Sequence, residues 1–336
     1  MAAEILSTHT PALFQKAVRE AVTRLRAGEV VALPTETVYG LAANALEAAA
    51  VAKIYEIKGR PAHNPIIVHV AGTELARQCV ADWPAAAAQL ARAFWPGPLT
   101  LVLPRAAGIP DAVTAGGHTV GVRWPSHPFM QAVIRECGFP LAAPSANLSN
   151  QISPTNAEHV AAQLGEKISL IVDGGQSQVG IESTVLDLTV LPARILRPGM
   201  IHAESLAAVL GSLQTATAGG KGGALKSPGL LAKHYSPRTK LVVLKWQSEA
   251  ELRVQLGGLE VAPDQCQVIA HTCIPAGLGT DNVSVIPHDA EAFARALYGE
   301  LHRCDAAGAR LIVVEALPET AEWSGIADRL RRAAAG

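Results

Sequence analysis

Two cations stand close together in the tetrapeptide Lys58-Gly59-Arg60-Pro61. In an extended segment, residues i and i+2 face the same side, so both charges would share one face of the chain. Like charges on one face repel each other unless water or an anion lies between them. The pair is therefore either a solvated surface pair or a site for a polyphosphate group, and the tetrapeptide alone favours the surface pair.

Polar side chains also follow several short apolar runs. The run 30–33 stops at Pro34, which lacks the N–H that a strand ladder needs, and the loop 34–40 (Pro-Thr-Glu-Thr-Val-Tyr-Gly) follows it. We expect the polar residues at such strand ends to converge in one cleft. They are Thr37, His69, Arg123, Ser145, Ser183 and Arg197. Together with Lys58 and Arg60, the arginines fit a substrate that bears phosphates and a carboxylate, because guanidinium binds both with paired hydrogen bonds.

Apolar periodicity predicts the elements that must position these groups. Helical spacing predicts helices over 11–27 and 46–57, and a further helix with Ser153 or Thr155 as its N-cap. Short apolar runs bounded by Gly and Pro predict strands. These strands lie within 30–33, 64–70, 99–103, 119–125, 140–143, 168–172, 180–188 and 195–199. Strands that alternate with helices indicate an α/β fold.

Composition narrows the class of protein. The chain has 336 residues, enough for two domains, with 49% hydrophobic residues and a net charge of −1, which argues against a protein that is basic throughout. Five cysteines without a CxxC pair suit free thiols in a reducing compartment. We identify no signal peptide and no apolar run long enough to span a membrane, so we expect a cytoplasmic protein that does not contact the membrane.

The composition changes between 211 and 229, where Gly219 to Gly223 has the chemistry of a flexible linker. The spacing of a P-loop is not met there. The segment 227–237 ends this linker with His234 and Tyr235, which act either as a docking anchor or as part of a site. Beyond it, strands at 240–246, 266–271 and 310–315 alternate with helices at 249–256, 290–304 and 323–335, which predicts a small parallel sheet.

At this point an ordered set of motifs resembles a known family. PTETVYGL, Lys58-x-Arg60, FWPGPLT, APSAN, IESTV and RPG occur in the order found in YrdC-type threonylcarbamoyl-adenylate synthases, and HYSP with SGIADRL resembles their long two-domain form. The resemblance implies a catalytic YrdC-like domain with a twisted mixed sheet at 1–205. It also implies a linker or lid at 206–238 and a Rossmann-like parallel α/β domain at 239–336.

The resemblance also implies an activity: synthesis of L-threonylcarbamoyl-AMP from L-threonine, bicarbonate or CO2, and ATP, with release of pyrophosphate. A separate transferase machinery would then modify tRNA beside the anticodon, and weak contact with tRNA itself stays open. Lys58 and Arg60 would act on the phosphates as catalytic residues. The implied ATP-binding residues are Lys58, Arg60, Asn64, Thr119, Ser145, Ser153, Arg197 and Tyr235. The implied threonine-binding residues are Thr37, His69, Arg123, Ala143 and Ser183, with Thr35 as an alternative to Thr37.

Such chemistry needs positioning and charge stabilisation rather than a protein nucleophile. We expect no protein metal site, and Mg2+ carried on the ATP phosphates. The carbamate is unstable in water, so a lid that includes His234 and Tyr235 would protect it. Three alternatives remain at this level: an RNA-binding protein that uses the cationic cleft, a Ser-His-Asp hydrolase, and a carbamoyl transferase of the kind used in metal-cofactor maturation.

Overall fold

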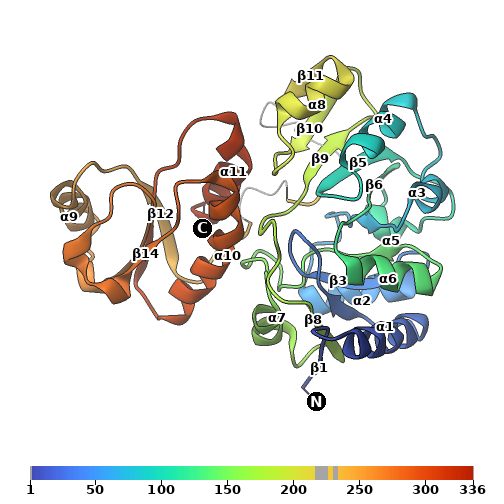
Figure 1. Cartoon of the computed structure of the whole chain (residues 1–336), viewed down its shortest axis with the longest axis horizontal. Helices are drawn as coiled ribbons and strands as arrows, with labels where there is room; N and C mark the ends of the chain where they lie inside the picture. Colours follow the sequence, from blue (N-terminus) through green and yellow to red (C-terminus); the bar gives the residue numbers. More distant parts are fainter. Residues whose placement is uncertain (1, 216–225, 230–233, 336) are drawn as a thin grey trace. The chain divides into compact units, whose positions relative to one another are not determined.

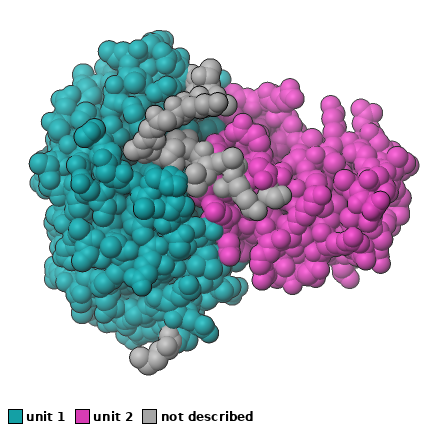
Figure 2. All heavy atoms as spheres, turned by 180° about the vertical axis from the view of Figure 1, so that it is seen from behind, with its two compact units in different colours: residues 1–149, 153–230 teal, residues 150–152, 231–336 magenta. Residues whose placement is uncertain are grey.

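The structure is a computed structural model that describes residues 2–215, 226–229 and 234–335. The chain forms two compact units, shown in separate colours in Figure 2. Unit 1 contains residues 1–149 and 153–230, and unit 2 contains residues 150–152 and 231–336. The predicted linker residues Gly219 to Gly223 lie outside the described residues.

An eleven-stranded mixed sheet forms the framework of unit 1, in the order β1-β8-β2-β3-β7-β4-β6-β5-β9-β10-β11 (Figure 1). The strands are β1 (Glu4–Ser7), β2 (Val31–Leu33), β3 (Gly40–Asn44), β4 (Val68–His69), β5 (Leu99–Pro104), β6 (Thr119–Arg123), β7 (Leu141–Ala142), β8 (Leu170–Asp173), β9 (Thr184–Asp187), β10 (Ala193–Arg197) and β11 (Leu213–Thr215). The helices are α1 (Pro11–Arg26), α2 (Ala48–Lys58), α3 (Thr73–Cys79), α4 (Ala85–Phe94), α5 (Asp111–Thr114), α6 (Pro128–Cys137), α7 (Ala157–Leu164) and α8 (Ala203–Leu210). The predicted mixed α/β fold is confirmed.

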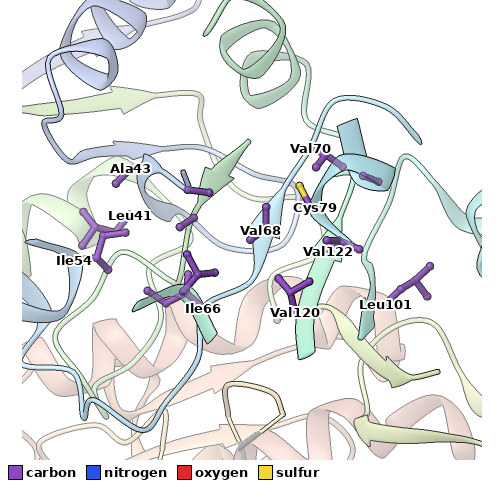
Figure 3. Packing of buried hydrophobic residues seen from close by; sticks show 14 of the residues in the cluster. Leu41, Ala43, Ile54, Ile66, Val68, Val70, Cys79, Leu101, Val120 and Val122 are labelled. Atoms are coloured by element: carbon purple, nitrogen blue, oxygen red, sulfur yellow. The ribbon is translucent and has the colours of Figure 1, made fainter. Parts of the chain in front are cut away.

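The largest cluster of buried apolar side chains forms a core against the sheet. Val68 of β4 and Val120 and Val122 of β6 belong to it, together with Leu41 of β3 and Ile54 of α2 (Figure 3). A second cluster joins α1 and α6 to the sheet. Since side chains alternate along a strand, the residues between these valines face the other way.

Two local predictions were wrong. Asn156, rather than Ser153 or Thr155, is the N-cap of α7, and its side chain accepts a hydrogen bond from the backbone N–H of His159 at 2.8 Å. Lys58 does not lie in an extended segment, because it is the last residue of α2. Gly59 ends that helix with φ of 59°, a left-handed conformation in which glycine avoids steric strain.

Unit 2 contains a four-stranded parallel sheet in the order β12-β15-β13-β14, so the predicted parallel α/β architecture is confirmed. Its strands are β12 (Lys240–Leu244), β13 (Cys266–Ala270), β14 (Val283–Val285) and β15 (Leu311–Glu315). Its α-helices are α9 (Glu249–Gly258), α10 (Ala290–Ala306) and α11 (Ser324–Ala333). Four short 3-10 helices lie at Pro263–Gln265, Ala276–Leu278, Thr280–Asn282 and Ala321–Trp323.

Two features of the division bear on the predicted boundaries. Leu206 of α8 is fully buried in the unit 1 core, and β11 pairs with β10, so residues beyond 205 still belong to unit 1. Residues 150–152 belong to unit 2, where Gln151 forms a parallel bridge with Ser236. The amide of Ser236 donates to Asn150 O at 2.8 Å. The functional boundaries at 205 and 238 stay predictions.

Candidate functional site

Strand β6 shows how the sheet presents polar groups. Val120 and Val122 enter the large core, so Thr119, Gly121 and Arg123 face the opposite side of the sheet. Thr119 and Arg123 are at opposite ends of the strand, about 13 Å apart at the usual rise of a strand. Thr119 and Arg123 therefore lie on the same face of the mixed sheet, at the two ends of one strand.

The same face continues on the neighbouring strands. Ile67, Val102 and Val185 form a small apolar cluster there, separate from the large core. His69 pairs with Arg123 in the parallel ladder of β4 and β6. Thr100 of β5 lies at 2.8 Å, hydroxyl to hydroxyl, from Ser183. This face thus combines an apolar floor with polar groups from β4, β5, β6 and β9.

Arg123 is the centre of one hydrogen-bonded group. It is 4% exposed, and its Nη2 lies 2.6 Å from Glu36 Oε1. Its Nη1 donates to Thr37 Oγ1 at 2.9 Å, and its Nε donates to Gly97 O at 3.3 Å. A buried arginine needs an anionic partner, and among the described residues Glu36 is that partner.

The two threonines of the loop 34–40 differ in their contacts. Thr35 Oγ1 donates to Val38 O at 2.6 Å and so uses its only proton within the loop. It must then accept from Thr37 Oγ1, which lies 3.0 Å away, while Thr37 also accepts from Arg123. Thr37 is therefore the threonine in contact with the arginine, and Thr35 holds it in place.

Burial and charge set the protonation of this group. Burial raises the pKa of Glu36, but the Arg123 guanidinium and hydrogen bonds, among them one from the backbone of Ser126, lower it by more, so that the carboxylate is ionised at neutral pH. Burial and the nearby Arg123 charge lower the pKa of His69 to about 3, which leaves its imidazole neutral. Nδ1 of His69 is buried without a hydrogen-bond partner among the described residues.

Arg197 and Ser183 form a second group on this face. Nε and Nη2 of Arg197 donate to Ser183 O at 3.1 and 3.0 Å, and Nη2 also donates to Ser183 Oγ at 3.1 Å. Gly199 follows β10 and lies close to the start of β9. Only glycine fits there, because a Cβ at this position would lie 2.6 Å from the backbone nitrogen of Thr184. Beside Ser183, Glu182 accepts a hydrogen bond from Ser153 Oγ at 2.6 Å.

The segment 226–229 lies against the same group. Pro228 O accepts a hydrogen bond from Arg197 Nη1 at 3.3 Å. Lys226 Nζ lies 3.0 Å from Asp187 Oδ2, and Asp187 is fully buried at the end of β9. This part of the predicted linker region is thus anchored to β9 and β10 within unit 1.

Lys58 and Arg60 form a third group. They are 2% and 8% exposed, so the interpretation as a solvated surface pair was wrong. Lys58 Nζ donates to Ser145 O at 2.6 Å and to the backbone carbonyl of Asn147. Burial and the Arg60 charge lower the pKa of Lys58 well below its usual value. Arg60 donates to Asn64 O at 2.9 Å, to Asn64 Oδ1 at 2.8 Å and to Pro65 O at 2.6 Å.

The remaining predicted residues have simpler surroundings. Thr119 is the half-buried first residue of β6. The backbone N–H of Ala143 donates to Ile67 O at 3.1 Å. Tyr235 belongs to unit 2, where it has φ of 60° and where the guanidinium of Arg329 lies 5.4 Å from its ring centre.

Sequence reasoning missed three polar residues of this face: Glu36, Thr100 and Glu182. Thr100 could have been found from the alternation in 99–103, because Leu99, Leu101 and Leu103 enter the large core and leave Thr100 on the other face. Glu36 lies in the loop already noted for its polar residues, but its pairing with Arg123 depends on contacts across 87 positions of sequence.

Metal-binding groups and membrane-spanning helices also bear on the class of protein. Among the described residues, no group of three or more His, Cys, Asp or Glu side chains is placed to hold a metal ion. The described part of the chain also contains no helix with the length and apolar character needed to cross a membrane.

Fold and site together define the class: an α/β protein in two units, with buried arginine, lysine and hydroxyl groups arranged on and beside one sheet face. Two family profiles match the chain. Sua5_yciO_yrdC, described as "Telomere recombination", matches residues 23–199. Sua5_C, described as "Threonylcarbamoyl-AMP synthase, C-terminal domain", matches residues 201–335. The chain belongs to the Sua5/YciO/YrdC family, in its two-domain form.

Individual relatives agree with this assignment. The chain is 38% identical over 321 residues to a threonylcarbamoyl-AMP synthase of Pyrococcus abyssi, which covers 94% of this chain and 93% of the relative. It is 41% identical over 344 residues to the threonylcarbamoyl-AMP synthase of Bacillus subtilis, which covers 98% and 95%. The crystal structure of P. abyssi Sua5 complexed with L-threonine superposes with a TM-score of 0.90 at 36% identity, covering 99% of this chain and 98% of that one.

Proposed function

We propose that this chain synthesises L-threonylcarbamoyl-AMP from L-threonine, bicarbonate or CO2, and ATP, and releases pyrophosphate. It is a transferase of the nucleotidyl-transferring type that serves the modification of tRNA. The observation that carries the proposal is the agreement of both units with threonylcarbamoyl-AMP synthases over nearly their whole length. The buried Arg123 group supports the proposal, because its guanidinium would bind an amino-acid carboxylate.

Arg123 would bind the threonine carboxylate. Each terminal nitrogen of its guanidinium carries two N–H groups. Thr37 accepts one N–H of Nη1, and Nη2 forms an ion pair with Glu36, so both nitrogens keep N–H groups for a ligand among the described residues. These N–H groups suit the two oxygens of a carboxylate. Thr37, rather than Thr35, would contact the substrate, since Thr35 is occupied within its loop. Neutral His69 would offer Nδ1 to the amino acid, and Ser183 and the carbonyl of Ala143 would complete the site.

Lys58, Arg60, Asn64, Thr119, Ser145, Ser153 and Arg197 would bind ATP. Ser145 O and Asn147 O already accept hydrogen bonds from Lys58, whose ammonium group has three N–H donors. Lys58 Nζ also donates to Asn147 Oδ1 at 3.5 Å, the longest of its three contacts. The lysine would therefore turn this N–H to the phosphate, while the other two hold the loop that carries Ser145. Arg60, held by Asn64 and Pro65, would supply a fixed positive charge.

In the reaction, the uncharged threonine amine attacks CO2 and gives up a proton to water to form a carbamate. A carbamate oxygen then attacks the α-phosphorus of ATP, and pyrophosphate leaves with the electrons of the broken P–O bond. The residues of this chain would position the substrates and stabilise the negative charge that develops on the leaving group. Mg2+ would be held chiefly by the phosphates, where it neutralises their charge.

The surrounding biology follows from the product. The carbamoyl adenylate would pass to a separate tRNA-modifying transferase in the cytoplasm, with at most weak direct contact between this chain and tRNA.

His234 and Tyr235 would protect the carbamate from water as part of a lid and contact ATP through Tyr235. A chain shortened to 1–205 is a poor test of the lid, because it cuts α8 within unit 1. Tyr235→Ala in the full chain is the better variant.

The experiment measures pyrophosphate release by the full-length protein. Release should require ATP, threonine and bicarbonate together, and serine should replace threonine poorly because it lacks the methyl group, which is worth about 1 kcal/mol or slightly more. EDTA should abolish release, and added Mg2+ should restore it. Release without threonine would contradict the proposal, as would strong salt-dependent tRNA binding without ATP consumption.

A further inference from the structure

The proposed threonine site contains a buried carboxylate, that of Glu36, which is not needed to bind the carboxylate of threonine. Glu36 is 6% exposed and lies 2.6 Å from the guanidinium of Arg123. A carboxylate in this position occupies the arginine on one side and cancels its charge. An arginine meant to capture any small carboxylate would bind more strongly without such a neighbour.

The charges around Arg123 balance to zero. Arg123 is positive, Glu36 is ionised and His69 is neutral. The charge of Glu36 also acts on His127, whose pKa it raises. Burial lowers the pKa of His127 by more, so that its pKa lies below the usual value. A ligand with only a carboxylate would therefore bring an uncompensated negative charge into a buried, neutral place, which costs free energy. A zwitterion adds no net charge.

We propose that Glu36 is a positioning and charge-balancing residue that makes the Arg123 site select an amino acid over a plain carboxylate. Glu36 holds the Nη2 edge of the guanidinium while Thr37 holds Nη1 and Gly97 O holds Nε. An amino-acid carboxylate bound to Arg123 would bring its α-ammonium group toward the carboxylate of Glu36, because Glu36 lies beside the same guanidinium. The inference rests on the proposed function, since it assumes that threonine binds at Arg123.

The geometry of the loop supports this assignment. The backbone carbonyl of Glu36 accepts from Val179 N at 2.7 Å, and that of Thr37 accepts from Gly180 N at 3.1 Å. These bonds fix the loop from the side of the segment that leads to Glu182 and Ser183. The carboxylate of Glu36 is thus held on a rigid backbone, which is the condition for a side chain that orients another.

The test compares three ligands by calorimetry on the full-length protein: threonine, 3-hydroxybutanoate, which lacks the amine, and threoninol, which lacks the carboxylate. Wild-type protein should bind threonine at least about tenfold more tightly than either analogue, because only threonine satisfies both charges. In Glu36→Gln, the affinity for threonine should fall by about tenfold or more, while the affinity for 3-hydroxybutanoate should rise, since the site now carries a net positive charge. Glu36→Asp, which keeps the charge, should restore the preference for threonine.

Opposite changes for the two ligands separate this role from a merely structural one, which would weaken both. Glu47→Gln in the same unit is the matched control, and its ligand preference should equal that of wild type. The inference is overturned if Glu36→Gln weakens both ligands equally, or if wild-type protein binds 3-hydroxybutanoate as tightly as threonine. The second result needs no variant, so it decides the matter even if Glu36→Gln fails to fold. Calorimetry does not depend on turnover, so threonine binding without pyrophosphate release would refute the proposed reaction and leave this inference standing.

Discussion

Replacing Lys58 with methionine tests whether the buried ammonium group organises the loop 145–149. Methionine has a similar length and removes the charge and the N–H donors. Ser145 O and Asn147 O would each lose a short hydrogen bond in a buried place. Each unsatisfied buried acceptor costs about 1–3 kcal/mol, and part of this is offset because a buried charge no longer has to be desolvated. We expect a net loss of about 2–4 kcal/mol in the unfolding free energy of unit 1.

The assay is urea unfolding of the full-length protein. Hydrogen exchange monitors the unfolding, so that the transition of unit 1 is separated from that of unit 2. With an m-value of about 3 kcal/mol per molar urea, the midpoint of unit 1 should fall by about 1 M. Lys53→Met is the matched control on the same helix. Lys53 is exposed and donates to Gly28 O, so its removal should shift the midpoint little. Equal shifts in the two variants would refute the reasoning.

The pH dependence gives a second test of the same group. The pKa of Lys58 is lowered in the folded protein, so the unfolded chain binds more protons than the folded one up to about pH 10.5. Wild-type stability should then rise with pH in this range relative to Lys58→Met. If the difference between the two proteins shrinks as the pH is raised, hydrogen bonding to the carbonyls outweighs burial and the assigned direction is wrong.

Three further outcomes follow from other contacts. Lys226→Met leaves the fully buried Asp187 without its closest cation. The segment 226–229 should then exchange amide protons faster, while the stability of unit 1 falls by only about 1 kcal/mol. Unchanged exchange would contradict the role of Lys226 in anchoring this segment. His69 has a folded pKa of about 3 and an unfolded value near 6.5, so wild-type stability should be lost as the pH falls through this window, by about 3–5 kcal/mol, and His69→Gln should flatten that loss in acid titrations. Glu315 accepts the backbone N–H groups of His271 and Thr272 at 2.7 and 2.9 Å, so Glu315→Gln should lower the stability of unit 2 by about 3 kcal/mol and leave the exchange of unit 1 unchanged.

Much of the local structure could be predicted because it depends on short-range patterns. The strand before Pro34 ends where the missing N–H requires, and the parallel sheet of unit 2 follows from strands that alternate with helices. The short strand β3 was missed, since Gly-Leu-Ala-Ala-Asn has no β-branched residue and its pairing with β2 and β7 supplies what local preference lacks.

The sequence by itself determined which side chains could serve a phosphate and a carboxylate, because their types and the order of their motifs are written in it. Only the tertiary structure decided how they are used. It buried Lys58 against the carbonyls of residues 145 and 147. It also paired Arg123 with Glu36. These contacts join residues far apart in the chain, and their strength depends on burial, which no local pattern records.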